Sequence, residues 1–276
     1  MRTDRNPLSL FWCALLVFIG CVNVFPILWM LSSACKLPNE LFTNGIHLFP
    51  AKPTVENFRI ALFDYDFLRW FANSVVTTLG IALGQVGISL LAAFALSYYH
   101  MRYNALVFAF LLSTMVIPFQ VTMIPNYILI SRLNLLDSLM AVVLPNLANA
   151  STFFFLRQHT RGIPTALYEA ASVEGADSWW SFRHVALPLC KSSISALFIL
   201  CVIDGWNQYF WPLLVLSSTS KRTVTIGLQQ FLDHEAGNRW GPFMATATLA
   251  SVPVIIVYCF VQKYIIEAFV SSGIKG

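Results

Sequence analysis

Charged side chains are scarce in this sequence. Asp, Glu, Lys and Arg make up only 11% of its 276 residues, whereas an average soluble domain carries about 25%. Hydrophobic residues make up 57% of the chain, and its mean hydropathy is +0.68. The core of a domain of this size cannot bury so much apolar surface, but a lipid bilayer can, so the composition predicts a membrane protein. The net charge of +4 is small, and no basic run predicts nucleic-acid binding.

Motifs for metal binding, nucleotide binding and catalysis are also missing. The six cysteines form no CxxC or Cys/His pair at metal-ligand spacing and are interpreted as small core hydrophobes. The five histidines are scattered, and no Ser/His/Asp set or pair of carboxylates within an apolar run predicts an enzyme. No G-x-x-x-x-G-K-S/T sequence provides a phosphate-binding loop for ATP. We therefore expect no catalytic residue, metal or cofactor in this chain.

Six long apolar runs lie between charged residues. About 20 apolar residues cross the hydrocarbon core of a bilayer as a helix, and a membrane β-strand would instead alternate over about 10 residues. We therefore predict an all-α membrane protein. The first run is longer than the roughly 7–15 apolar residues of a signal peptide, so it is interpreted as a retained helix. We expect Pro118 and Pro125 to interrupt the third run. The expected spans are 8–32, 71–98, 105–124, 138–156, 195–216 and 243–261, within a single domain over residues 1–276.

The distribution of basic residues does not orient these spans. With both termini inside, nine Lys and Arg residues lie on the inner side and eight on the outer side. Inner loops normally carry a clear excess of these residues. An even number of spans therefore fixes only that both termini lie on the same side of the membrane.

The connection between the fourth and fifth runs, residues 157–190, has the pattern of two short helices. Pro164 suits the first turn of one helix, and Gly175 is placed to end it in the left-handed conformation. Asp177 or Ser178 can then cap a second helix, which carries two tryptophans and ends before the next proline. We predict a helix–turn–helix at the membrane surface.

The first of these two helices has features that suit docking against another protein. Ala170 and Ala171 are small enough to allow close approach, and Glu169 beside them supplies one directional polar contact. An amphipathic surface helix without a partner would have the same spacing. The spacing alone leaves both interpretations open.

Residues 168–189, YEAASVEGADSWWSFRHVALPL, resemble the EAA loop of bacterial ABC importer permeases. Asn73-Ser74, IPFQVTMIPNYILISRLNLLDS, GWNQYFWPLL, GLQQF and the terminal GIKG are similar to the smaller membrane subunit of carbohydrate-type importers. That group includes permeases for maltose, for multiple sugars and for glycerol-3-phosphate. The chain departs from many relatives at Lys191-Ser192, where they have Lys-Pro, and in its looser last turn. The positions that match the EAA loop are Glu169, Ala170, Ala171, Gly175, Leu187 and Pro188.

The resemblance implies a type I ABC importer permease with six transmembrane helices in the cell inner membrane. Both termini and the loop at Glu169 would be cytoplasmic. The implied partners are a second permease subunit, two copies of an ATPase subunit that bind ATP and Mg²⁺, an extracytoplasmic solute-binding protein and the lipid membrane. Closure of the ATPases would push the loop and switch the helices between inward- and outward-open states. The implied cargo is a sugar or sugar-like solute, with sn-glycerol-3-phosphate or a glycerophosphodiester as the alternative.

Polar residues within apolar runs usually face the interior of a helix bundle or a wet cavity, because lipid exposure costs them free energy. Aromatic planes with amide and carboxylate groups suit stacking and hydrogen bonding to a polyhydroxylated solute. A phosphorylated solute would need cationic contacts, and the apolar runs contain none. Hydrogen bonding between neighbouring helices is the alternative role. The candidate solute-pathway residues are Gln120, Asp204, Trp206, Asn207, Gln208 and Trp211.

Three other classes of membrane protein fit the sequence less well. A transporter driven by an ion gradient is expected to show inverted repeats or charged pairs within spans, and Asp204 is the one acidic residue within them. An intramembrane enzyme needs a catalytic set that the sequence lacks. A structural subunit without transport would not need the loop at Glu169. The sequence therefore favours an importer permease.

Overall fold

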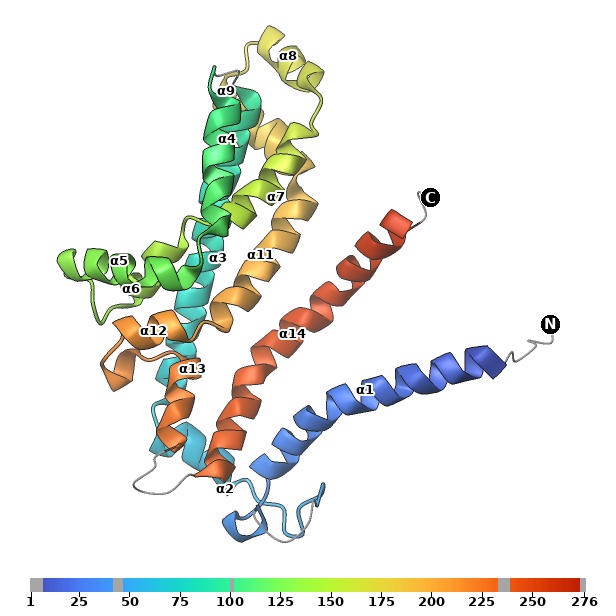
Figure 1. Ribbon diagram of the computed structural model, residues 1–276, viewed down its shortest axis with the longest axis vertical. Helices are drawn as coiled ribbons and strands as arrows, with labels where there is room; N and C mark the ends of the chain where they lie inside the picture. The colour runs from blue at the N-terminus through green and yellow to red at the C-terminus, as the bar shows by residue number, and fades with distance from the viewer. Residues whose placement is uncertain (1–6, 42–46, 100–101, 233–238, 274–276) are drawn as a thin grey trace. The chain divides into compact units, whose positions relative to one another are not determined.

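The computed structural model describes residues 7–41, 47–99, 102–232 and 239–273, and these residues form helices and turns without a strand. The longer helices are α1 (Pro7–Ala34), α3 (Phe67–Tyr98), α4 (Asn104–Ser113), α5 (Phe119–Arg132), α7 (Ala150–Arg161), α8 (Thr165–Val173), α11 (Lys191–Trp206) and α14 (Trp240–Gly273) (Figure 1). The shorter helices are α2 (Glu56–Arg59), α6 (Leu139–Val143), α9 (Ser178–Ser181), α10 (Leu187–Leu189), α12 (Phe210–Val215) and α13 (Val224–Gly227).

The described residues separate into two compact units. The first contains residues up to 68 together with 227–252, and the second contains 69–226 together with the residues from 253 onward. The prediction of a single domain over 1–276 stays a prediction. Residues 157–190 and the solute-pathway candidates, with the helices that hold them, all belong to the second unit.

Three helical segments are individually long and apolar enough to cross a membrane, namely Leu10–Ala34, Phe67–Tyr98 and Trp240–Phe260. Three further pairs of helices reach that length and hydropathy only when their two members are taken together, and each pair is bent. Six spans result if each bent pair is one span, which is consistent with the predicted number. The bent pairs are Asn104–Val116 with Phe119–Arg132 (100°), Leu139–Asn146 with Ala150–Arg161 (47°), and Ser178–Leu189 with Lys191–Trp206 (76°).

Interruptions of the helix change three of the predicted spans. The run predicted as 138–156 is broken between Asn146 and Ala150, with a bend of 47°. The run predicted as 105–124 is interrupted at Pro118, as predicted, and the chain turns by 100° beside this residue, whereas α5 continues through Pro125. The ring of a proline removes an N–H donor and clashes with the preceding turn of a helix, so a break at Pro118 is expected. The run predicted as 195–216 stops being helical at Trp206, and α12 begins only at Phe210. Apolarity located all three runs, but of their interruptions only the one at Pro118 was predicted from the sequence.

Helix α3 is central to the second unit and lies beside α4, α7 and α11 (Figure 1). Its later half packs into an apolar cluster with α7, α8 and the start of α11, and Ile81 in its earlier half packs with α5, α6 and α12. The hydroxyl of Thr160 on α7 adds polar contacts to Ser97 (2.9 Å) and to the carbonyl of Ala93 (3.3 Å). The larger cluster contains Leu90, Ala93, Phe94, Phe153, Leu156, Ile163, Tyr168, Phe182, Ala186, Cys190 and Leu197.

The start of α3 is tied by hydrogen bonds to residues 219–224. The indole N–H of Trp70 donates to the carbonyl of Thr219 at 3.0 Å. The amide of Asn73 donates to two carbonyls of this segment at 2.9 Å each, and the hydroxyl of Ser74 accepts the backbone N–H of Val224 at 2.9 Å. These bonds give the Asn73-Ser74 pair, two turns into α3, a structural role.

Asp137 ties the connection before α6 to the turn after α12. Its backbone N–H donates to the carbonyl of Val215 at 2.8 Å, and its carboxylate accepts the amides of Ser217 (3.0 Å) and Ser218 (2.9 Å). Lys221 Nζ lies 3.4 Å from the same carboxylate. Hydrogen bonds from the hydroxyl and amide of Ser218 are the main reason that the pKa of Asp137 is lowered to about 2.

In the first unit, the buried side chain of Asn57 joins α2 to the end of α1. Its Nδ2 donates to the carbonyls of Ala34 (2.9 Å) and Lys36 (2.7 Å). Gly241, near the start of α14, packs directly on this amide, since a Cβ on that glycine would lie 2.5 Å from Asn57 Oδ1 and 2.7 Å from its Cγ. The two hydrogen bonds hold the amide in place, so the position requires glycine.

We expect Gly241→Ala to lower the free energy of unfolding by about 1–3 kcal/mol, because the new methyl group overpacks this contact. Gly20→Ala is the matched control, since nothing lies within 4 Å of a Cβ at Gly20 and alanine favours a helix by about 1 kcal/mol over glycine. Thermal unfolding of the detergent-solubilised proteins measures the stability of both variants. Equal unfolding midpoints for the two variants would contradict the close packing of Gly241 on Asn57.

We expect the contribution of Asp137 to depend on pH. A carboxylate whose folded pKa is lowered from 3.8 to about 2 stabilises the fold fully above the unfolded pKa and loses that contribution as the pH falls through the folded pKa. Asp137→Asn should therefore lower the unfolding midpoint near neutral pH. The difference from the unsubstituted protein should shrink as the pH falls from about 4 towards about 2. A difference in midpoint that stays constant over this pH range would argue against a lowered pKa for Asp137.

Candidate functional site

The first part of the candidate site is α8 and the turn that follows it. Pro164 is the N-cap of α8, one position before the first turn predicted for it. Gly175 has a φ of +84°, which lies in the left-handed region that glycine adopts readily. The amides of Gly175 and Ala176 donate to the carbonyls of Ser172 and Ala171, both at 3.0 Å, which is the Schellman arrangement. The prediction that Gly175 ends this helix is confirmed.

The second helix of the loop begins at a side-chain cap. The carboxylate of Asp177 accepts the backbone N–H of Trp180 at 2.7 Å, so Asp177 rather than Ser178 is the cap. From α9 the chain continues through a π-helical turn at Phe182–Ala186 into α10. The prediction that the second helix ends before Pro188 is wrong, because the proline lies within α10, in its first turn. Leu187 and Pro188 are both exposed.

The outer face of α8 includes Glu169, Ala170 and Val173. All three are exposed, and the apolar side chain of Val173 is 88% accessible. Ala171 is only 6% exposed and faces the protein's own interior. Of the two alanines expected to allow close approach of a partner, only Ala170 is therefore on the outer face.

Tyr168 fixes the inner face of α8 to the end of α3. Its buried ring lies edge-on to Tyr98 at 5.2 Å and to Phe94 at 6.1 Å between ring centroids. Its hydroxyl is buried and has no hydrogen-bond partner in the described part of the chain. Burial is the main reason that the pKa of Tyr168 is raised to about 12. Ring packing joins the exposed helix to the long central one.

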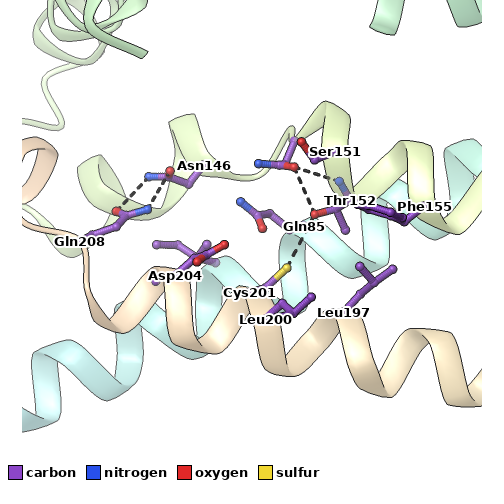
Figure 2. Close-up of a pocket in the computed structure, with 13 residues that line it drawn as sticks. Gln85, Asn146, Ser151, Thr152, Phe155, Leu197, Leu200, Cys201, Asp204 and Gln208 are labelled. Carbon is purple, nitrogen blue, oxygen red and sulfur yellow. Dashed lines mark hydrogen bonds between the residues drawn. The ribbon is translucent and has the colours of Figure 1, made fainter. Parts of the chain in front are cut away.

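The second part of the candidate site is a pocket of about 260 Å³ between α3, α7 and α11 (Figure 2). Polar side chains reach it from each of these directions: Gln85 from α3, Asn146 from the turn before α7 and Asp204 from α11. The lining residues are Ile81, Gln85, Asn146, Asn149, Ser151, Thr152, Phe155, Leu197, Leu200, Cys201, Asp204, Gly205 and Gln208.

Some of the polar groups in the pocket are already paired. The amide of Gln208 donates to Asn146 at 2.9 Å, with a longer return contact of 3.4 Å (Figure 2). Asn149 Oδ1 accepts the backbone N–H of Thr152 at 2.9 Å and so caps α7.

Other groups in the pocket are available to a solute. The side chain of Gln85, like that of Asp204, makes no hydrogen bond or ion pair to another residue of the described ranges. Within those ranges, no group of three or more His, Cys, Asp or Glu side chains is arranged to hold a metal ion. The pocket therefore offers hydrogen-bonding groups from at least two helices.

The pocket brings together two of the predicted solute-pathway residues, Asp204 and Gln208. The two predicted indoles are packed in the interior instead. Trp206 is 7% exposed and lies edge-on to Phe71 at 5.5 Å, and Trp211 is 3% exposed. The N–H of Trp211 donates to a carbonyl of α6 at 3.0 Å. Neither ring is part of the pocket lining.

The remaining two candidates also lie outside the lining. The amide of Asn207 folds back to the carbonyl of Ile203 at 2.8 Å, within its own helix turn. Gln120 is exposed in the first turn of α5. Their participation in a solute pathway stays a prediction.

Several polar residues of the pocket were not among the residues predicted from the sequence. Gln85, Asn146 and Asn149 are amides within the second and fourth apolar runs, and Ser151 follows them. The criterion applied to the fifth run, a polar side chain deep in an apolar segment, would have selected the three amides. Which of them face one another depends on the packing of distant helices.

Comparison with known proteins gives a consistent result along the whole chain. Residues 85–269 match the family described as binding-protein-dependent transport system inner membrane component. The chain is 32% identical over 280 residues to the sn-glycerol-3-phosphate transport system permease protein UgpE of Brucella abortus (strain 2308), covering 98% of this chain and 99% of that protein. It is also 32% identical over 282 residues to the arabinooligosaccharides transport system permease protein AraQ of Halalkalibacterium halodurans, covering all of both.

A solved structure has the same fold. A chain in the crystal structure of a bacterial ABC transporter involved in the import of the acidic polysaccharide alginate superposes with a TM-score of 0.85 at 24% identity. The superposition covers 96% of this chain and 98% of that one. The family match extends over more than half of the chain, and both relatives align with nearly all of it. The chain therefore belongs to the family of binding-protein-dependent transport system inner membrane components, as its resemblance to ABC importer permeases predicted.

Proposed function

We propose that this chain is a membrane-spanning permease subunit of an ATP-driven importer for a sugar or sugar-like solute. The observation that carries the proposal is the exposed Glu169 on α8, a helix that is fixed to α3 from its other face. Family membership supports the transport role, and the names of the relatives support a polyhydroxylated cargo. ATP and Mg²⁺ would be bound by separate ATPase subunits.

The outer face of α8 suits docking into a groove on an ATPase subunit. The small side chain of Ala170 allows close approach, and the exposed side chain of Val173 would bury apolar surface in the contact. The carboxylate of Glu169 would make a charge-assisted hydrogen bond, which is stronger than a neutral one and fixes the orientation of the helix. Gly175 sets the direction in which the second helix leaves this surface.

Movement of α8 would be transmitted to the pocket through α3. Tyr168 packs on Phe94 and Tyr98 of α3, and Gln85 on the same helix lines the pocket. A continuous helix moves as a rigid body, so a push on α8 by closing ATPases would shift the wall that carries Gln85. Such a shift would link nucleotide binding to opening and closing of the solute pathway.

The proposed assembly contains a second permease subunit, two copies of an ATPase and an extracytoplasmic solute-binding protein, in the cell inner membrane. Both termini and the α8 loop would face the cytoplasm. A bacterial alginate ABC transporter has also been crystallised in complex with a periplasmic protein bound to an alginate pentasaccharide, and this complex supports the expected binding-protein partner.

An importer of sn-glycerol-3-phosphate is the second candidate. Its support is the 32% identity to the permease proteins with that name. The lining of the pocket contains no Lys, Arg or His that would neutralise a phosphate.

We expect Glu169→Ala to reduce solute-stimulated ATP hydrolysis and uptake about 10- to 150-fold, because loss of one charge-assisted hydrogen bond costs roughly 1.5–3 kcal/mol. The variant should still insert in the membrane. Glu174→Ala is the matched control, since Glu174 is also exposed but lies at the C-cap of α8. ATP hydrolysis and uptake are measured for both variants in proteoliposomes that hold the complete importer. Normal uptake by the Glu169 variant, or an equal loss in the control, would contradict the coupling role.

We expect Tyr168→Phe to preserve uptake, because the buried hydroxyl has no hydrogen-bond partner to lose among the described residues. Tyr168→Ala should remove about 3–5 kcal/mol of aromatic packing and loosen α8 from α3. Uptake should then fall while an ATPase still co-purifies, and trypsin should cleave faster at Arg161 or Arg183. Unchanged uptake and unchanged cleavage in the alanine variant would show that the ring packing does not transmit the movement.

A further inference from the structure

One formal charge lies in the lining of the pocket, the carboxylate of Asp204. The side chain is exposed to this space from the last turn of α11 (Figure 2). None of the other lining residues is Lys, Arg, His, Asp or Glu. In the described ranges, no cation lies within ion-pair distance of this carboxylate. The field inside the pocket is therefore that of one uncompensated negative group.

The uncharged polar groups around Asp204 are suited to hydroxyl groups. A carboxylate accepts hydrogen bonds only, whereas an amide both donates and accepts them. Gln85 offers an amide with no partner in the described ranges, and Gln208 uses only one of its two N–H groups on Asn146. A hydroxyl group can donate to Asp204 and accept from such an amide at the same time. A phosphate or carboxylate group of a solute can only accept.

The surroundings strengthen the effect of the charge. The pocket has apolar walls made by Ile81, Leu197 and Leu200, and it lies between helices of a membrane protein. Electrostatic interactions are much stronger beside such low-dielectric walls than in bulk water. An anionic group that entered this space would meet repulsion from Asp204 without a cation to offset it.

We propose that Asp204 makes this pocket a charge filter, which accepts the hydroxyl groups of an uncharged solute and rejects anionic ones. The inference rests on the proposed importer function and narrows its cargo. Phe155 is the one aromatic residue of the lining, whereas binding of organic cations typically uses several aromatic faces. The filter therefore selects a neutral polyhydroxylated solute. It excludes the phosphorylated solute that remained as the second candidate.

The filter can be tested without knowing the solute, by measuring how fast charged reagents enter the pocket. Ser151→Cys places one thiol in the lining, in a chain whose six native cysteines are replaced by serine or alanine. The assembled importer is treated without ATP with 2-aminoethyl methanethiosulfonate, a cation, or with 2-sulfonatoethyl methanethiosulfonate, an anion. The ratio of the two rates is the readout, because any change in the reactivity of the thiol itself cancels from it.

We expect Asp204→Asn to lower the cation-to-anion rate ratio about tenfold, since charge of one sign in a cleft with low-dielectric walls raises the local counter-ion concentration by about tenfold or more. Glu174→Gln is the control, because Glu174 has the same charge outside the pocket. It should leave the ratio unchanged. A ratio that does not respond to Asp204→Asn, or that responds equally to the control, would overturn the proposal.

Protection of the thiol by small solutes provides a second readout. With Asp204 present, neither sn-glycerol-3-phosphate nor choline should slow modification of the Ser151→Cys thiol by an uncharged methanethiosulfonate. Protection by sn-glycerol-3-phosphate would overturn the rejection of anions, and protection by choline would overturn the preference for a neutral solute. These measurements need no ATP-driven step. If Glu169→Ala leaves uptake normal while Asp204→Asn still lowers the rate ratio, the coupling role alone is refuted. If Glu169→Ala reduces uptake while Asp204→Asn leaves the rate ratio unchanged, the filter alone is refuted.

Discussion

Backbone N–H and C=O groups that leave a helix within a membrane have little water to bind, and every interruption of an apolar run must satisfy them within the protein. The second unit does this with side chains. Ser138 and Asn149 cap α6 and α7, Trp211 donates to a carbonyl of α6, and the hydroxyl of Thr225 donates to the carbonyl of Gln208 at 2.7 Å. These bonds make the interruptions stable parts of the fold. The pocket lies beside two of them, because an interrupted helix leaves space and polar groups that a continuous helix would fill.

The two parts of the candidate site depend on one continuous element. Helix α3 runs without a break from Phe67 to Tyr98, and it carries both the aromatic residues that hold α8 and the amide that faces the pocket. The elements that form the opposite walls are short, bent or capped. A rigid helix between the exposed face of α8 and a polar cavity suits the proposed role, in which a distant chemical event must change access to a solute.

Structural features that depend on residues close together in the sequence could be predicted from it. Gly175 and Asp177 act through hydrogen bonds that span only a few residues, so the turn between α8 and α9 follows from local chemistry. Pro118 signalled an interruption, but its 100° bend depends on the packing of α5. The burial of Trp206 and Trp211 could not be foreseen, because their partners come from runs more than 60 residues away. Composition located the apolar segments, whereas the direction of each polar side chain required the arrangement of the helices.

The length of α11 has a consequence for how the protein reaches its membrane. Its 16 residues extend over about 24 Å, which is shorter than a hydrocarbon core of about 30 Å. It also contains Asp204 in its last turn, and an acidic side chain within a span opposes insertion, by roughly 2.5–3.5 kcal/mol where it lies at the centre. Such a segment is a poor membrane anchor by itself. Its biogenesis therefore requires helices that have already left the translocon, and insertion of this segment is coupled to its tertiary folding.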